Sequence, residues 1–128
     1  MAMTLPSDVG QVYEDFTFIG PSGARKTLRL LVDTGSTFTW IHADILRDLG
    51  VPPSGRRRFT TIESREVPRP IGDVLVEYQG ETRATVVVFA TPQDAQVLGL
   101  HALEGLSLEV DPLNRRLKKS DAVLALAV

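Results

Sequence analysis

Two segments near the N-terminal end of the chain alternate apolar and polar positions in the manner of β-strands. They are QVYEDFTFIG at residues 11–20 and KTLRLLVDT at residues 26–34, and the glycines and proline between them mark a turn. In the second segment the alternation gives way to the apolar run LLV, as expected of a strand that enters a core. The pattern therefore predicts a hairpin whose second strand presents Asp33 at its buried end.

The rest of the chain favours further strands and two short helices. Apolar residues at helical spacing, closed by Gly50 and two prolines, predict a helix of about two to three turns within residues 41–53. Residues 54–90 are predicted to form strands, with YQGET as a hairpin turn. A second short helix is expected at residues 100–106, and then a strand, LSLEV, that ends at the turn DPLN. The prediction is a mainly β fold with one or two short helices.

The charge balance argues against a polyanionic partner. Lys and Arg number 14 and Asp and Glu 16, so a formal net charge of −2 provides no overall attraction for nucleic acid or an anionic membrane. The triplet Arg56, Arg57 and Arg58 has no aromatic ladder beside it and is expected on a solvated loop. The chain has no cysteine, and neither His42 nor His101 has a neighbour at a metal-binding spacing. We expect no metal and no cofactor.

The two ends of the chain carry no recognisable targeting segment. MAMTLPSDVGQVYEDF has no basic start followed by an apolar run, so it does not resemble a signal peptide. The C-terminal tract AVLALAV falls far short of the ~20 apolar residues that span a bilayer. We therefore expect one cytoplasmic domain over residues 1–128, with its core at about residues 10–118, a tail at residues 119–128 and no membrane partner.

The strongest candidate for chemistry is the string LLVDTGST. Gly35 permits a turn that brings the backbone close to a ligand, Thr34 offers a hydroxyl that locks the turn, and Ser36 can hydrogen-bond a carboxylate. Asp33 at a rigid strand end is then mounted as a catalytic acid would be. The alternative interpretation is an Asx-type turn, in which the carboxylate only caps local N–H groups.

Two aromatic residues follow this string. Phe38 and Trp40 are candidates for the lining of a substrate pocket. A large aromatic residue just before an amphipathic helix is more often part of the core, however. We therefore expect both side chains in the core.

The segment LLVDTGSTFTWI resembles the active-site motif of the aspartic peptidases, specifically of the single-lobed, retropepsin-like family. Downstream, QVLGLHALEGLSLEVDP is similar to the second signature of this family, in which two apolar residues precede a glycine, a short helix and a strand. The match covers most of residues 28–117 and extends to small bacterial members, in which VDPxNRRL commonly follows the helix. The resemblance implies a single-lobed acid protease barrel in which Val97, Leu98 and Gly99 pack beneath the active-site loop.

The resemblance also implies a mechanism that needs two copies of the chain. Aspartic peptidases are the standard example of two carboxylates about 3 Å apart that share one proton, so that one activates a water and the other polarises the peptide carbonyl. This sequence has a single DTG, because no other aspartate is followed by Ser or Thr and then Gly. The resemblance thus implies an aspartic endopeptidase, acting on peptide or protein, in which each subunit of a homodimer supplies Asp33. Thr34 would exchange hydroxyl hydrogen bonds between the two loops, and Gly35 would meet the substrate backbone.

Two further features are expected from the same resemblance. A flap hairpin should lie at FTTIESREVPRPIG, with its tip at Ile62, Glu63, Ser64 and Arg65, although the glycine-rich tip of the viral members is missing. The tail at residues 119–128 is expected to pair in a sheet between subunits; a frayed end and a membrane-surface anchor are the alternatives.

Two other functions remain open at this point. One is a catalytically inactive retropepsin-fold module that serves in dimerisation or peptide binding. The other is a nucleic-acid-binding β-barrel, which would need a basic face that the net charge does not provide.

Overall fold

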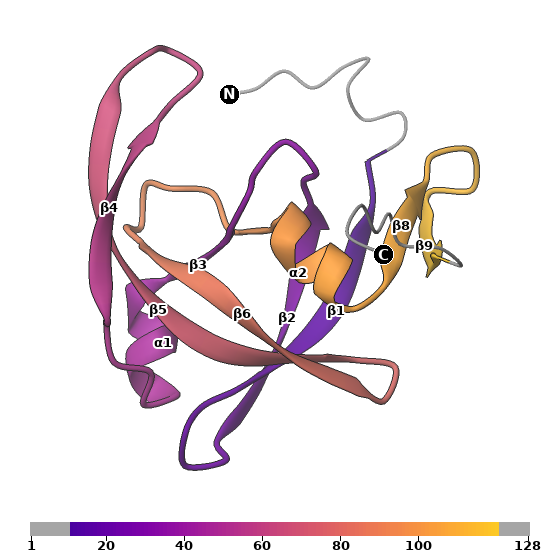
Figure 1. Ribbon diagram of the computed structural model, residues 1–128, viewed down its shortest axis with the longest axis horizontal. Helices are drawn as coiled ribbons and strands as arrows, with labels where there is room; N and C mark the ends of the chain where they lie inside the picture. Colours follow the sequence, from indigo (N-terminus) through magenta and orange to yellow (C-terminus); the bar gives the residue numbers. More distant parts are fainter. Residues whose placement is uncertain (1–10, 121–128) are drawn as a thin grey trace, which may run out of the picture.

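The computed structural model describes residues 11–120 and is mainly β, as predicted (Figure 1). Its elements are β1 (Tyr13–Ile19), β2 (Arg25–Val32), β3 (Thr39–His42), α1 (Ala43–Asp48), β4 (Gly55–Thr60), β5 (Glu66–Tyr78), β6 (Glu81–Ala90), β7 (Val97–Leu98), α2 (Leu100–Gly105), β8 (Leu108–Asp111) and β9 (Arg116–Lys119). Seven strands form one sheet in the order β1-β2-β7-β3-β6-β5-β4, and an additional pairing of β1 with β5 closes part of it into a ring. Strands β8 and β9 form a separate sheet of two strands. The predicted single-lobed, mainly β fold is confirmed.

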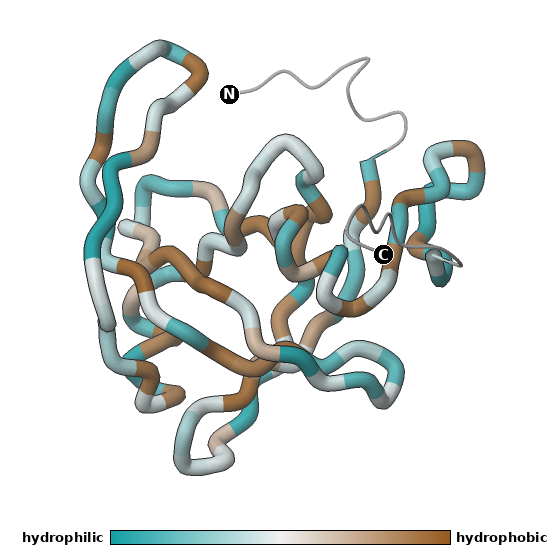
Figure 2. Tube along the Cα trace, viewed as in Figure 1, coloured by the Kyte–Doolittle hydropathy of each residue, from teal (hydrophilic) through white to brown (hydrophobic). Residues whose placement is uncertain are grey.

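The alternation along the first hairpin determines which side chains enter the core. Phe16 and Phe18 of β1 are fully buried, and Leu30 and Val32 of β2 are buried as well. Full burial of such side chains stabilises the fold by roughly 1.5–3 kcal/mol each. Other members of the core come from the centre of the chain and from both helices: Ile41, Leu46, Val76, Val87, Leu98, Leu103 and Leu106. Figure 2 shows the hydrophilic character of the β5–β6 turn, which lies away from this core.

Strand β7 has only two residues but occupies a central position in the sheet. It pairs in parallel with β2, where Val32 lies opposite Leu98, and antiparallel with β3, where Trp40 lies opposite Val97. Since β2 and β3 are separated by β7, the residues that connect them must cross over its end. The connection is the DTGS segment, so the topology lays the candidate active-site loop directly on β7.

The structure corrects the prediction for the first helix. Helix α1 has six residues, less than the predicted two to three turns. Ile41 is buried as its spacing suggested, but it belongs to β3, where it lies opposite Phe89 of β6. Because residues 39–42 pair with β6, the helix begins only at Ala43.

The structure also corrects the placement of the arginine triplet. Arg56, Arg57 and Arg58 lie in β4 rather than in a loop, although all three are exposed as expected. Strand β4 is the edge of the seven-stranded sheet, and charged side chains are frequent on edge strands because they oppose pairing with other chains.

Strand β9 was not predicted. Lys119, which the sequence assigned to the tail, is its last residue; of the interface strand expected at residues 119–128, residues 121–128 lie outside the described part of the chain. In residues 11–120, no helix has the length and apolar character that a membrane crossing requires.

Candidate active site

The conformation of Asp33 is fixed by hydrogen bonds on both sides of the residue. Its backbone N–H donates to the carbonyl of Leu98 at 2.9 Å, and its carbonyl accepts from the N–H of Ser36 at 3.1 Å. Its carboxylate Oδ1 accepts the N–H of Gly35 at 2.9 Å, which is the bond of an Asx-type turn. Within residues 11–120 the other oxygen, Oδ2, accepts no hydrogen bond. One oxygen thus orients the side chain, and the other is available to a ligand.

The first turn of α2 supports the same loop from below. The N–H of Leu100 donates to the carbonyl of Ser36 at 2.8 Å, and that of His101 donates to the carbonyl of Thr37 at 3.0 Å. The first N–H groups of a helix have no partner within the helix. The loop carbonyls satisfy them here, so the loop and α2 hold each other in place.

Gly99, between β7 and α2, lies where no side chain fits. A Cβ atom at this position would be 2.3 Å from the carbonyl oxygen of Phe38. The N–H of Gly99 donates to the hydroxyl of Thr39 at 3.0 Å, and Thr39 is fully buried. The structure therefore brings Val97, Leu98 and Gly99 against the active-site loop, and it requires the glycine of the VLG sequence.

Two hydroxyls of the loop differ from the sequence-based expectation. The Ser36 hydroxyl donates to the carbonyl of Phe38 at 2.8 Å rather than to the Asp33 carboxylate. Thr34 is exposed, and its hydroxyl has no hydrogen-bond partner in the described part of the chain. Thr34 therefore does not lock the turn within one chain.

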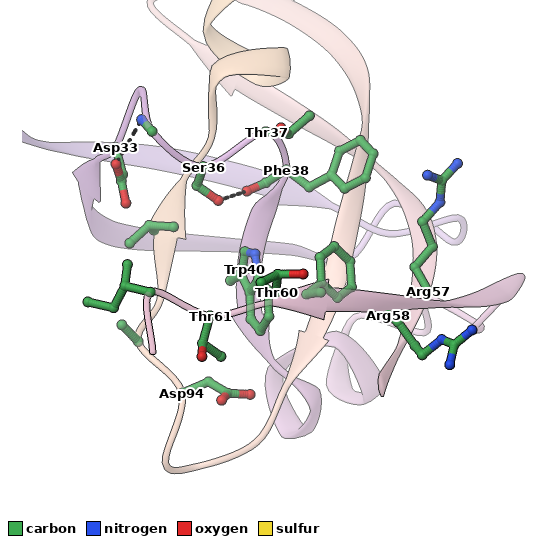
Figure 3. Close-up of a pocket in the computed structure, with 15 residues that line it drawn as sticks. Asp33, Ser36, Thr37, Phe38, Trp40, Arg57, Arg58, Thr60, Thr61 and Asp94 are labelled. Carbon is green, nitrogen blue, oxygen red and sulfur yellow. Dashed lines mark hydrogen bonds between the residues drawn. The ribbon is translucent and has the colours of Figure 1, made fainter. Parts of the chain in front are cut away.

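Asp33 opens onto a cleft of about 550 Å³ (Figure 3). This volume lies within the usual range for ligand-binding clefts, roughly 300–1,000 Å³. Its walls come from the active-site loop, β3, β4, the turn after β4 and the β6–β7 connection. The lining residues are Asp33, Gly35, Ser36, Thr37, Phe38, Trp40, Arg57, Arg58, Phe59, Thr60, Thr61, Ile62, Asp94, Ala95 and Val97.

Phe38 and Trp40 line this cleft, so their assignment to the core was wrong. Both are partly exposed, whereas Thr39 is buried. The reason is that strand β3 precedes the helix, and alternate residues of a strand face opposite sides. The ring of Phe59 packs edge-on to Trp40 at 5.0 Å and to Phe38 at 6.4 Å between centroids. These three rings form the aromatic wall of the cleft.

The hairpin of β4 and β5 has its tip where the flap was expected. Ser64 has φ 63°, the left-handed conformation that glycine adopts most easily. The Thr61 hydroxyl accepts the N–H groups of Glu63 and Arg65, and the Thr61 N–H donates to the Arg65 carbonyl at 2.8 Å. Ile62 is fully exposed and is the member of the predicted tip that lines the cleft. Bonds to Thr61 thus support the turn that lacks a glycine.

An ion pair in the cleft wall was not anticipated from the sequence. Arg69 of β5 donates two hydrogen bonds to Asp94, at 2.7 and 3.0 Å, with side chains only 17% and 19% exposed. The hydrogen bond from Arg69 holds the pKa of Asp94 below its usual value, although partial burial opposes this shift. Because 25 residues separate the partners, no local pattern indicated the pair. It joins the β6–β7 connection to the base of the flap.

The two histidines also take part in hydrogen bonds around the cleft. His42 Nε2 lies 3.0 Å from the carbonyl oxygen of Asp94, and His101 Nδ1 lies 3.3 Å from the hydroxyl of Thr85. Among residues 11–120, no three His, Asp or Glu side chains are close enough together to hold a metal ion.

The described residues form a single lobe with one Asp-Thr-Gly loop, a β4–β5 hairpin and a cleft lined by residues of both. The family model described as aspartyl protease matches residues 19–102, a span that includes all three features and more than half of the chain. The chain therefore belongs to this aspartyl protease family of the retropepsin-like clan. Comparison with curated proteins gives no match.

We predict that Gly99→Ala lowers the free energy of unfolding by about 1–3 kcal/mol, because the new methyl group overlaps the Phe38 carbonyl and the loop must shift. Urea unfolding measures the change. Gly105→Ala is the matched control in α2, where a Cβ would meet its nearest atom at 3.9 Å and alanine favours the helix. An equal loss in both variants would contradict the packing argument.

The Arg69–Asp94 pair predicts a specific pH dependence of stability. We expect Asp94→Asn to lower the free energy of unfolding at pH 7 by about 1.5–3 kcal/mol, the range for hydrogen bonds to charged groups. The folded-state pKa of Asp94 is lowered, so the pair stabilises the fold fully above the ordinary Asp pKa and loses this effect as the pH falls through the folded value. The difference between wild type and variant should therefore shrink below about pH 3.9.

Urea unfolding at several pH values tests this dependence. Asp15→Asn provides the control, because Asp15 and its partner Arg29 are both more than half exposed at 3.4 Å and contribute little. A constant difference for Asp94→Asn down to pH 2 would refute the assignment.

Proposed function

We propose that the protein is an aspartic endopeptidase in which Asp33 from each subunit of a homodimer forms the catalytic pair. The observation that carries this proposal is the carboxylate of Asp33, which is held rigidly in a cleft with one oxygen free. Membership of the aspartyl protease family supports peptide hydrolysis as the general reaction.

The second carboxylate must come from another chain. Asp94 is the other carboxylate that lines the cleft, and both of its oxygens accept hydrogen bonds from Arg69. Since Arg69 holds both of its oxygens, Asp94 is not placed to share a proton with Asp33. A two-fold axis beside the active-site loop would instead place a second Asp33 opposite the first. The exposed Thr34 hydroxyl is then free to bond the partner loop.

The proposed dyad catalyses hydrolysis by transferring protons between its two carboxylates, the water and the peptide. The ionised carboxylate accepts a proton from a water whose oxygen attacks the peptide carbonyl carbon, while the protonated carboxylate donates its proton to the carbonyl oxygen. The tetrahedral intermediate then breaks at the C–N bond: the carboxyl group that took the proton from water donates it to the leaving nitrogen, and the other carboxylate takes a proton from a hydroxyl of the intermediate, so that the pair again holds one proton. The Gly35 N–H bond keeps the Asp33 side chain oriented throughout these steps.

The flap and aromatic wall suit a bound peptide. The fully exposed Ile62 at the flap tip is available to cover a substrate and to exclude water from the reaction. Phe38, Trp40 and Phe59 offer an apolar surface to substrate side chains.

A catalytically inactive peptide-binding or dimerisation module is the second candidate. The observation in its favour is the Asx-type bond of Asp33, which gives the carboxylate a structural role without any catalysis. Under this alternative, the free Oδ2 has no catalytic use.

Asp33→Asn is predicted to lower kcat/KM for peptide cleavage by at least about 100-fold, because the amide cannot exchange a proton with water. The variant should keep its dimer and its unfolding midpoint, since the amide oxygen still accepts the Gly35 N–H. Asp48→Asn, at an exposed position in α1, is the control and should retain full activity. Undiminished cleavage by Asp33→Asn would favour a different catalytic group, and absence of cleavage by the wild type would favour the binding module.

Mixing wild type with Asp33→Asn tests whether two chains form one site. If subunits exchange at random, an equal mixture at constant total concentration should show about one quarter of the wild-type activity, because only wild-type pairs hold two aspartates. A site within one chain would give about one half. Sedimentation at the same concentrations confirms that the mixture is dimeric.

A further inference from the structure

Arg57 faces the cleft from an electrostatically unfavourable position on β4. In the β4–β5 pairing it lies directly opposite Arg69, and like charges directly opposite each other destabilise a sheet. Arg69 is neutralised by Asp94, whereas Arg57 forms no ion pair among residues 11–120. The next residue, Arg58, has Glu66 at 3.7 Å. The sheet therefore leaves one unneutralised guanidinium in the cleft.

The aromatic wall holds Arg57 in place. Its guanidinium carbon lies 5.7 Å from the centre of the Phe38 ring, a cation–π contact. Figure 3 shows Arg57 and Asp33 at opposite ends of the cleft, with Phe38 and Trp40 between them. One end of the cleft thus carries a carboxylate, the middle is aromatic and the other end carries a cation.

We propose that Arg57 determines specificity by binding the carboxylate of a Glu or Asp side chain in the substrate. This inference rests on the proposed peptidase function and names its substrate class. A guanidinium offers two parallel N–H donors to a carboxylate. An apolar or aromatic substrate residue lies on Phe38 and Trp40, nearer the scissile bond, and the acidic residue lies beyond it. An acidic residue beside Asp33 is disfavoured by like-charge repulsion.

The proposed homodimer extends this preference to both sides of the scissile bond. A two-fold axis repeats every feature of one cleft in the other. The preferred substrate is therefore a peptide with an apolar centre and an acidic residue on each flank. Because Arg57 is exposed, the preference should weaken as salt concentration rises.

Cleavage of a peptide library derived from a digested proteome tests the proposal. Wild type, Arg57→Gln and Arg56→Gln are incubated with the library at about pH 5.5, where Glu side chains are ionised. We expect Glu and Asp to be enriched at one position on each side of the cleaved bonds. For one cleaved sequence, the ratio of kcat/KM for the Glu peptide to that for its Gln counterpart should fall about 3- to 10-fold in Arg57→Gln.

Arg56→Gln is the matched control, because it removes the same charge from the adjacent residue of β4, which does not line the cleft. For Arg56→Gln, the ratio of kcat/KM for the Glu peptide to that for the Gln peptide should equal the wild-type ratio. Arg57→Glu should reverse the preference toward peptides with Lys at the same position, which guards against a folding defect as the cause. An equal fall in the Arg56 and Arg57 variants would overturn the proposal, since any surface cation would then suffice.

Binding separates this inference from the proposed catalysis. Fluorescently labelled octapeptides with Glu beside two Phe residues, or with Gln instead, are titrated into Asp33→Asn and into Asp33→Asn combined with Arg57→Gln. A preference for Glu that depends on Arg57 supports the inference even if no peptide is cleaved. Cleavage without acidic enrichment, or equal binding of both octapeptides, overturns the inference and leaves the peptidase assignment intact.

Discussion

The hydrogen bond from the Asp33 N–H to the Leu98 carbonyl is the contact on which the site depends. It exists because β7 is inserted between β2 and β3, so that the aspartate loop must cross the end of β7. Gly99 then allows the Phe38 carbonyl to approach closely, and α2 donates to the loop from below. The two residues of β7 thus hold the β2–β3 connection, and with it the Asp33 carboxylate, in one conformation.

The same rigidity bears on the proposed mechanism, in which one chain supplies only half of the catalytic pair. The loop fixes Asp33 so that one of its oxygens is free, and the neighbouring Asp94 is held by Arg69. A single lobe therefore offers one carboxylate available for proton exchange in this cleft, whereas hydrolysis by this route needs two. In the proposed mechanism, Asp33 is therefore the reactive carboxylate of each chain, and Asp94 has the structural role of holding the cleft wall through Arg69.

The sequence predicted those features that depend on local patterns. The strands of the first hairpin, the two helices and the position of Asp33 follow from periodicity and turn residues. The orientation of Trp40 and the Arg69–Asp94 pair did not follow, because both depend on which strands become neighbours. The helix at residues 41–53 was predicted too long for the same reason, since β3 pairs with β6 and β7. The pairing of strands, which periodicity does not reveal, determines these features.

Arg57 and Arg69 lie opposite each other on β4 and β5, so the charge state of one affects the proposed selection of substrate by the other. An aspartic peptidase dyad works on the acidic side of neutrality, where weaker ion pairs begin to lose their carboxylates. The lowered pKa of Asp94 keeps Arg69 neutralised in that range. If Asp94 were protonated, Arg69 would become a second cation opposite Arg57 and would compete for the substrate carboxylate. In the proposed specificity, the partly buried Arg69–Asp94 pair therefore keeps Arg69 from competing with Arg57 for the substrate carboxylate.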